Sequence, residues 1–153
     1  MEEDCAPSRR VTEGMPYCGG MPSFRMTIGT DPAQVGGACQ AFGEFAEAHK
    51  VPTAIRRSVS VALDELLNNA IAHGSAGVVS IEAELSADRL RVTLSDDGKP
   101  FNPLDMATPD TGLSLEERQI GGLGIHLARR LMDEVTYLRL ADHNVITLAK
   151  LLA

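Results

Sequence analysis

The spacing of apolar residues is the feature that most constrains the fold of this chain. Over residues 35–49 they recur at every third or fourth position, which predicts an amphipathic helix. A second helix opens at Pro52 and runs to about His73, where Gly74 stops it. Beyond this point short strand-like runs replace the helical pattern.

Five short runs have the length and composition of strands, namely 24–28, 78–85, 90–95, 135–140 and 145–151. Short turns join the second run to the third and the fourth to the fifth, which predicts two antiparallel hairpins. In the closing hairpin the turn residues are Asp142, His143 and Asn144. A third helix is expected from near Gly122 to about Met132. This order predicts an α+β fold, a two-layer α/β sandwich with helices on one face of a mixed, mostly antiparallel sheet.

The chain of 153 residues is long enough for one domain with its own core, expected over residues 21–153. Residues 1–20 mix Gly, Pro, Ser and charge without periodicity, which predicts a disordered extension. The formal net charge of −7 disfavours binding to nucleic acid. No apolar run approaches the roughly 18 residues of a membrane span, and the three cysteines match no zinc pattern. A cytoplasmic protein without membrane contact is therefore expected.

Three polar residues of the second helix, Glu65, Asn69 and His73, are spaced four apart and form one stripe within an arc of about 80°. Mg²⁺ in proteins takes one or two oxygen ligands plus substrate phosphates, and the Asn69 amide oxygen is such a ligand. Glu65 can orient or deprotonate a nucleophile near a γ-phosphate, and His73 can meet a phosphate. An isolated pattern of this kind is more often the solvated edge of an amphipathic helix.

Two further motifs fall at the joints between elements. Asp96 and Gly98 directly follow a strand, where a carboxylate can accept a hydrogen bond from the exocyclic amine of adenine and a glycine lets the base approach. Alone, this motif is more often a plain turn. Gly121, Gly122 and Gly124 open the third helix, where converging N–H groups favour an anion such as a triphosphate. Alone, these glycines could equally form a hinge. Together, the three motifs predict a site for ATP with Mg²⁺.

With these motifs in this order, the sequence resembles the GHKL ATP-binding family, whose fold is the Bergerat α/β sandwich, over about residues 22–152. Within that family it is most similar to the anti-sigma-factor serine kinases. Three segments carry the resemblance: 63–74, 94–103 and 113–137. The resemblance implies ATP and Mg²⁺ as cofactors, Glu65 as catalytic base and Asn69 as magnesium ligand. It also implies that Asp96 holds the adenine amine, with Gly98 beside it.

The same resemblance implies further contacts with the nucleotide. The glycine-rich start of the third helix would surround the phosphates through Gly121, Gly122, Leu123, Gly124 and Ile125. Residues 102–120 would form a mobile ATP lid, and His73 would lie near the phosphates. Thr147 would lie on the late strand near the aspartate that holds adenine.

The function implied by the resemblance is that of a stand-alone protein serine/threonine kinase. It would phosphorylate an anti-sigma-factor antagonist, sequester a sigma factor or similar regulator, and form a homodimer. Three alternatives stay open: an ATP-gated protein-binding module without catalysis, a detached histidine-kinase catalytic domain, and a degenerate fold that binds no ligand. Neither nucleic acid nor a membrane is expected as a direct partner.

Overall fold

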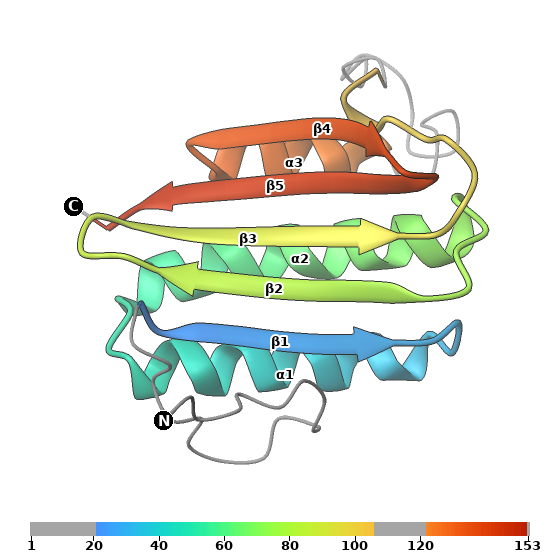
Figure 1. The fold of residues 1–153 in the computed structure, drawn as a ribbon. Helices are drawn as coiled ribbons and strands as arrows, with labels where there is room; N and C mark the ends of the chain where they lie inside the picture. Colours follow the sequence, from blue (N-terminus) through green and yellow to red (C-terminus); the bar gives the residue numbers. More distant parts are fainter. Residues whose placement is uncertain (1–20, 106–121, 153) are drawn as a thin grey trace, which may run out of the picture.

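A computed structural model describes residues 21–105 and 122–152 of the chain (Figure 1). Its elements, in order, are β1 (Ser23–Ile28), α1 (Ala33–Ala48), α2 (Thr53–Ala72), β2 (Val79–Leu85), β3 (Arg89–Asp96), the 3₁₀ helix η1 (Pro103–Asp105), α3 (Gly122–Leu131), β4 (Glu134–Leu140) and β5 (His143–Leu151). Each helix and strand expected from the sequence is present, with small shifts at its ends. The predicted disorder of residues 1–20 and most of the predicted lid lie outside the described residues.

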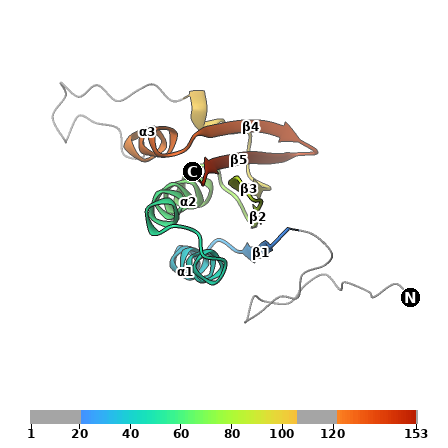
Figure 2. The same ribbon diagram turned by 90° about the vertical axis from the view of Figure 1, so that its left-hand side faces the viewer.

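The five strands form one sheet in the order β1-β2-β3-β5-β4. Every pairing between the described strands is antiparallel, so the sheet is not mixed as the sequence had suggested. The three α-helices cover one face of this sheet, as Figure 2 shows. The predicted two-layer α+β sandwich is therefore confirmed. None of the described helices combines the length and apolar character that crossing a membrane requires.

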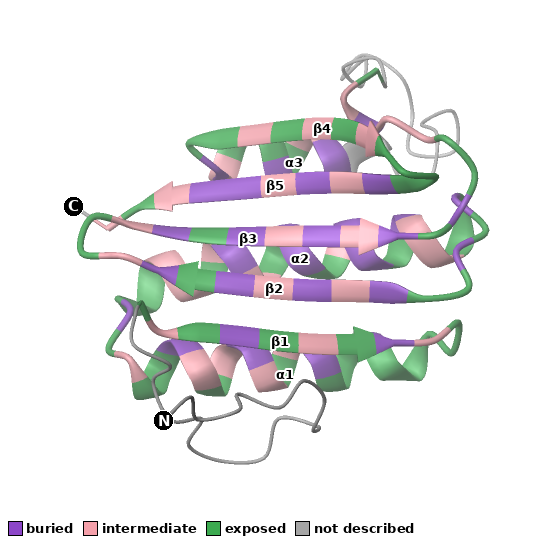
Figure 3. Ribbon diagram, in the orientation of Figure 1, coloured by how far each residue is buried: buried purple, intermediate pink, exposed green. Residues whose placement is uncertain are grey.

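The core lies between the helices and the sheet face that they cover. Along β2 and β3, buried residues alternate with more exposed ones (Figure 3). In β3 the buried residues are Leu90, Val92, Leu94 and Asp96. Successive side chains of a strand point to opposite faces, so all four face the helices. Asp96 therefore ends a row of apolar side chains and brings a carboxylate to the edge of the core.

The turn between β4 and β5 is shorter than the sequence suggested. Ala141 and Asp142 both have positive φ, 49° and 62°, as the central residues of a two-residue hairpin turn require. His143 and Asn144, expected in the turn, belong instead to β5. The register pairs Asn144 with Asp96 of β3. The short turn thus places an amide side chain beside the carboxylate at the edge of the core.

Candidate functional site

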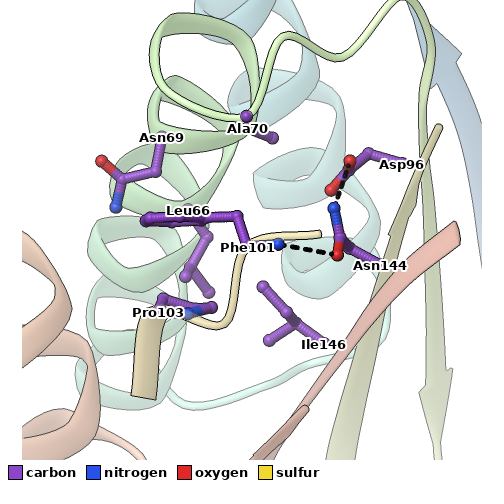
Figure 4. A pocket seen from close by; sticks show the side chains of 9 residues that line it. Leu66, Asn69, Ala70, Asp96, Phe101, Pro103, Asn144 and Ile146 are labelled. Atoms are coloured by element: carbon purple, nitrogen blue, oxygen red, sulfur yellow. Dashed lines mark hydrogen bonds between the residues drawn. The ribbon is translucent and has the colours of Figure 1, made fainter. Parts of the chain in front are cut away.

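A narrow pocket lies where the C-terminal half of α2 meets the end of β3 and the start of β5 (Figure 4). Its lining residues are Leu66, Asn69, Ala70, Gly74, Asp96, Phe101, Pro103, Asn144 and Ile146. Most of these are apolar, and the polar side chains among them are those of Asn69, Asp96 and Asn144. Binding sites for small molecules commonly combine an apolar lining with a few placed polar groups. The fold thus brings together two predicted site residues, Asn69 and Asp96.

Asn69 carries an unsatisfied polar group in this pocket. The residue is only 5% exposed, and its Nδ2 has no hydrogen-bond partner among the described residues. A buried donor without a partner costs about 1–3 kcal/mol, so a site that keeps one has a reason to do so. The side chain projects from α2, as Figure 4 shows. A polar ligand would supply the missing partner, and the amide oxygen suits Mg²⁺.

Asp96 has one occupied and one available carboxylate oxygen. Its Oδ1 accepts hydrogen bonds from the backbone N–H of Gly98, at 2.9 Å, and from Nδ2 of Asn144, at 3.0 Å. No described residue donates to Oδ2. An ionised carboxylate only accepts hydrogen bonds, so the ligand group that fits Oδ2 is a donor such as an amine. The exocyclic amine of adenine has this chemistry.

Backbone bonds tie the loop after β3 to the loop after α2. The N–H of Lys99 donates to the carbonyl of Gly74 at 3.0 Å. Oδ1 of Asp97 accepts the N–H groups of Gly77, at 2.7 Å, and Val78, at 2.9 Å. Those two donors, first Val78 and then Gly77, lower the pKa of the Asp97 carboxyl below its usual value. The end of β3 is thereby held against the end of α2, where the pocket lies.

The structure gives Gly98 a role in packing. A Cβ at this position would lie 2.3 Å from the carbonyl oxygen of Gly74 and 3.1 Å from the amide nitrogen of Ala76. The missing Cβ of Gly98 thus permits the close contact with the loop after α2, and the predicted approach of a base to Gly98 stays a prediction. The carbonyl of Gly98 also accepts a hydrogen bond of 2.8 Å from Nη1 of Arg139, on β4. Gly98 therefore connects the end of β3, the loop after α2 and strand β4.

The other members of the polar stripe on α2 lie outside the pocket lining. Glu65, one turn before Asn69, is partly exposed and forms no hydrogen bond or ion pair with any described residue. His73 caps the C-terminus of α2, where its backbone N–H donates to the carbonyl of Asn69 at 2.9 Å, and it is exposed. The predicted roles of Glu65 as base and of His73 at a phosphate stay predictions.

The glycine-rich segment is only partly described. Gly122 begins α3, which also contains Leu123 and Gly124, while Gly121 lies outside the described residues. Ile125 is 3% exposed and packs in the hydrophobic core. Its side chain is absent from the pocket lining. The expected contact of this segment with phosphates therefore rests on its backbone and stays a prediction.

Thr147 does not lie near Asp96, and the prediction that it would is wrong. It is partly exposed between the buried Ile146 and Leu148, so its side chain points to the opposite face of the sheet. The residue that contacts Asp96 from the late strand is Asn144. The alternation of apolar residues, continued back from Leu148 and Ile146, places Asn144 on the same face. Asn144 was missed because it follows Asp142 and His143, and all three residue types are common in turns.

Known proteins match the chain over most of its length. The family model described as histidine kinase-like ATPase domain matches residues 28–150. The serine/threonine-protein kinase BtrW of Bordetella bronchiseptica is 26% identical over 98 residues, covering 61% of this chain and 69% of that protein. The serine-protein kinase RsbW of Bacillus subtilis is 33% identical over 100 residues. This match covers 60% of each protein, less than two thirds of RsbW.

A solved structure with a similar fold contains the RsbU and RsbW domains of a Mycobacterium tuberculosis protein. It superposes with a TM-score of 0.62 and 16% identity, and covers 85% of this chain and 32% of that one. At this identity the likeness supports the fold alone. The fold, the sequence motifs and the family model nevertheless agree with one another. This protein therefore belongs to the histidine kinase-like ATPase family.

Proposed function

We propose that this protein is an ATP-dependent protein serine/threonine kinase of the anti-sigma-factor type. One observation carries the proposal: the pocket joins Asn69, whose buried Nδ2 has no partner among the described residues, to Asp96, whose Oδ2 receives no hydrogen bond from them. A nucleotide with Mg²⁺ offers partners to both groups. The names of the relatives BtrW and RsbW support serine or threonine as the acceptor residue.

The two polar ends of the pocket would bind different parts of the nucleotide. Oδ2 of Asp96 accepts the exocyclic amine of adenine, while Leu66 and Ile146 supply apolar contact for a ring. The amide oxygen of Asn69 takes a ligand position on the metal. The N-terminus of α3 offers backbone N–H groups to the phosphates. When bound, ATP with Mg²⁺ supplies the phosphoryl group that is transferred.

Glu65 would act as the base in this proposal. It lies one helical turn from Asn69 and is partly exposed, so the hydroxyl of another protein can reach it. No described residue pairs with its carboxylate, which leaves it available to accept the proton of a serine hydroxyl. Phosphoryl transfer depends mainly on positioning and on charge stabilisation, so the task of Glu65 is to orient the serine hydroxyl and accept its proton.

The partners follow from the same proposal. The phosphate acceptor is an anti-sigma-factor antagonist, and the sequestered protein is a sigma factor or a similar regulator. The kinase works in the cytoplasm as a homodimer. The net charge of −7 favours protein partners over direct contact with nucleic acid.

A second candidate function is that of an ATP-gated binding module without catalysis. Phe101 and Pro103 line the pocket and belong to the segment that leads into residues 106–121. Figure 4 shows both side chains at the pocket. A ligand in the pocket would contact both side chains. In this case ATP would bind but stay unconsumed with every candidate partner.

Calorimetric titration with ATP and Mg²⁺ tests the proposal, with Asp96→Asn as the matched control. The variant keeps an oxygen for Gly98 and Asn144 but places an NH₂ group where Oδ2 stood, facing the adenine amine. We expect saturable binding by the wild type and none by the variant. Absence of binding by a folded wild-type protein would remove the proposal. An acid-stable phosphoprotein product then identifies serine or threonine as the acceptor, because phosphohistidine is acid-labile.

A further inference from the structure

Asn144 has the most completely bonded side chain at the site and is 2% exposed. Its Nδ2 donates to Oδ1 of Asp96, at 3.0 Å, and to the carbonyl of Lys99, at 2.9 Å. Its Oδ1 accepts the backbone N–H of Phe101, at 3.2 Å, and the hydroxyl of Tyr137, at 2.6 Å. An amide side chain has two donor hydrogens and two acceptor lone pairs, so its full capacity is used.

The neighbours of Asn144 permit only one orientation of its amide. The carbonyl of Lys99 can only accept a hydrogen bond and the N–H of Phe101 can only donate one. Nδ2 must therefore face Lys99 and Asp96, as Figure 4 shows for Asp96. This orientation holds Oδ1 of Asp96 from one side while the N–H of Gly98 holds it from another. The carboxylate cannot rotate without breaking one of these bonds.

We propose that Asn144 is a positioning residue that makes the nucleotide site selective for adenine. This inference rests on the proposed function of ATP binding. By holding Oδ1 of Asp96, Asn144 keeps Oδ2 free for the exocyclic amine of the base. Through Lys99 and Phe101, the same side chain fixes the start of the segment that lines the pocket. The Asn144 amide thus fixes the position of the Asp96 carboxylate, which accepts the base, and that of the adjacent pocket wall at Phe101.

The surrounding groups require an amide rather than another side chain of similar size. A carboxylate at position 144 would keep the acceptor side toward Phe101 and Tyr137 but would face Asp96 and the carbonyl of Lys99 with oxygens. Acceptors facing acceptors repel, so the Asp96 side chain would turn away from its observed position. An apolar side chain at position 144 would remove all four of these hydrogen bonds.

The test measures the affinity of ATP and of inosine triphosphate, each with Mg²⁺, for the wild type and Asn144→Asp. Inosine carries a carbonyl where adenine carries the amine, so this position accepts a hydrogen bond and cannot donate one to Asp96. We expect the wild type to prefer ATP, and the variant to bind ATP about tenfold or more weakly while its affinity for inosine triphosphate falls much less, because only ATP depends on Asp96. Thr147→Val, on the same strand but the opposite face, is the control and should keep the wild-type preference.

Each outcome decides between the two proposals. A folded wild type that binds neither nucleotide removes the proposed function and this inference with it. A wild type that binds ATP, with an Asn144→Asp variant that keeps its preference over inosine triphosphate, overturns the positioning role and leaves the proposed function intact. Equal weakening of both nucleotides would show a merely structural role and also overturns it. If Asn144→Asp does not fold, Asn144→Thr, whose hydroxyl offers one donor, replaces it. The same ratio of the ATP affinity to the inosine triphosphate affinity then decides the outcome.

Discussion

Gly98 lies against Gly74 so closely that a Cβ at position 98 would stand 2.3 Å from the carbonyl oxygen of Gly74. That carbonyl also accepts the N–H of Lys99, so it cannot move away without losing a bond. We therefore expect Gly98→Ala to lower the free energy of unfolding by about 1–3 kcal/mol, as measured by urea denaturation. Binding of ATP should weaken with it, because Asp96 is bonded to the N–H of residue 98.

Gly37→Ala is the matched control for this substitution. Gly37 lies in α1, and a Cβ there would meet nothing within 4 Å. Alanine in a helix interior should stabilise the protein by roughly 0.5–1 kcal/mol relative to glycine. Equal stability of the two variants would contradict the close contact at position 98.

Glu65→Gln separates binding from phosphoryl transfer. The glutamine keeps the size and polarity of the side chain but cannot accept a proton at neutral pH. Glu65 is outside the pocket lining, so we expect ATP affinity to stay near that of the wild type. The rate of transfer to a protein acceptor should fall by about 10²–10⁴-fold, the usual contribution of a general base. Transfer at the wild-type rate would remove Glu65 from the chemistry.

Asn69→Ala tests whether this amide, whose Nδ2 has no partner in the part of the chain that the structure describes, is kept for a ligand. The substitution removes a buried group whose lack of a partner costs about 1–3 kcal/mol, and this gain offsets the lost packing. We expect the melting temperature without nucleotide to be unchanged or higher. The increase in ATP affinity that Mg²⁺ produces should disappear. A variant that melts lower and still responds to Mg²⁺ would show that Asn69 serves the fold instead.

The low pKa of Asp97 gives a pH dependence that Asp97→Asn should remove. Hydrogen bonds from the N–H groups of Val78 and Gly77 lower the pKa of this carboxyl in the folded state. The ionised carboxylate therefore stabilises the fold above its unfolded-state pKa of about 3.9, and this contribution is lost as the pH falls through the folded-state value.

Melting curves of the wild type and Asp97→Asn between neutral pH and pH 2 would measure this effect. The wild type should melt higher near neutrality, and the difference should shrink below about pH 4. A difference that stays constant over this range would mean that the charge of Asp97 is not involved.

The sequence predicted the layers of the fold because its periodicity reports which face of each element is buried. The run 90–95 was recognised as a strand, and Asp96 was correctly placed at its end. Asn69 could be predicted to share a helix face with Glu65, because spacing by four fixes this. The burial of Asn69 could not be predicted, because burial depends on how α2 packs against the strands.

Asn144 and Thr147 show where prediction from the sequence ended. Asn144 was assigned to the turn that precedes β5, whereas Thr147 was placed near Asp96 from the family resemblance alone. Asp142, His143 and Asn144 are all common in turns, so a three-residue turn was the natural interpretation. The partner of a strand residue depends on long-range pairing, which local composition does not specify. The four bonds of Asn144 exist only because β3, β4 and β5 meet in this register.

The two-residue turn at Ala141 and Asp142 has a consequence for how this protein can change through evolution. Surface turns usually tolerate inserted or deleted residues. Here one residue more or less would shift β5 along its neighbours or force a bulge, and Asn144 would no longer stand opposite Asp96. The residue types of this turn can therefore vary more freely than its length. The length is constrained because it sets the register of β5 and, with it, the lining of the pocket.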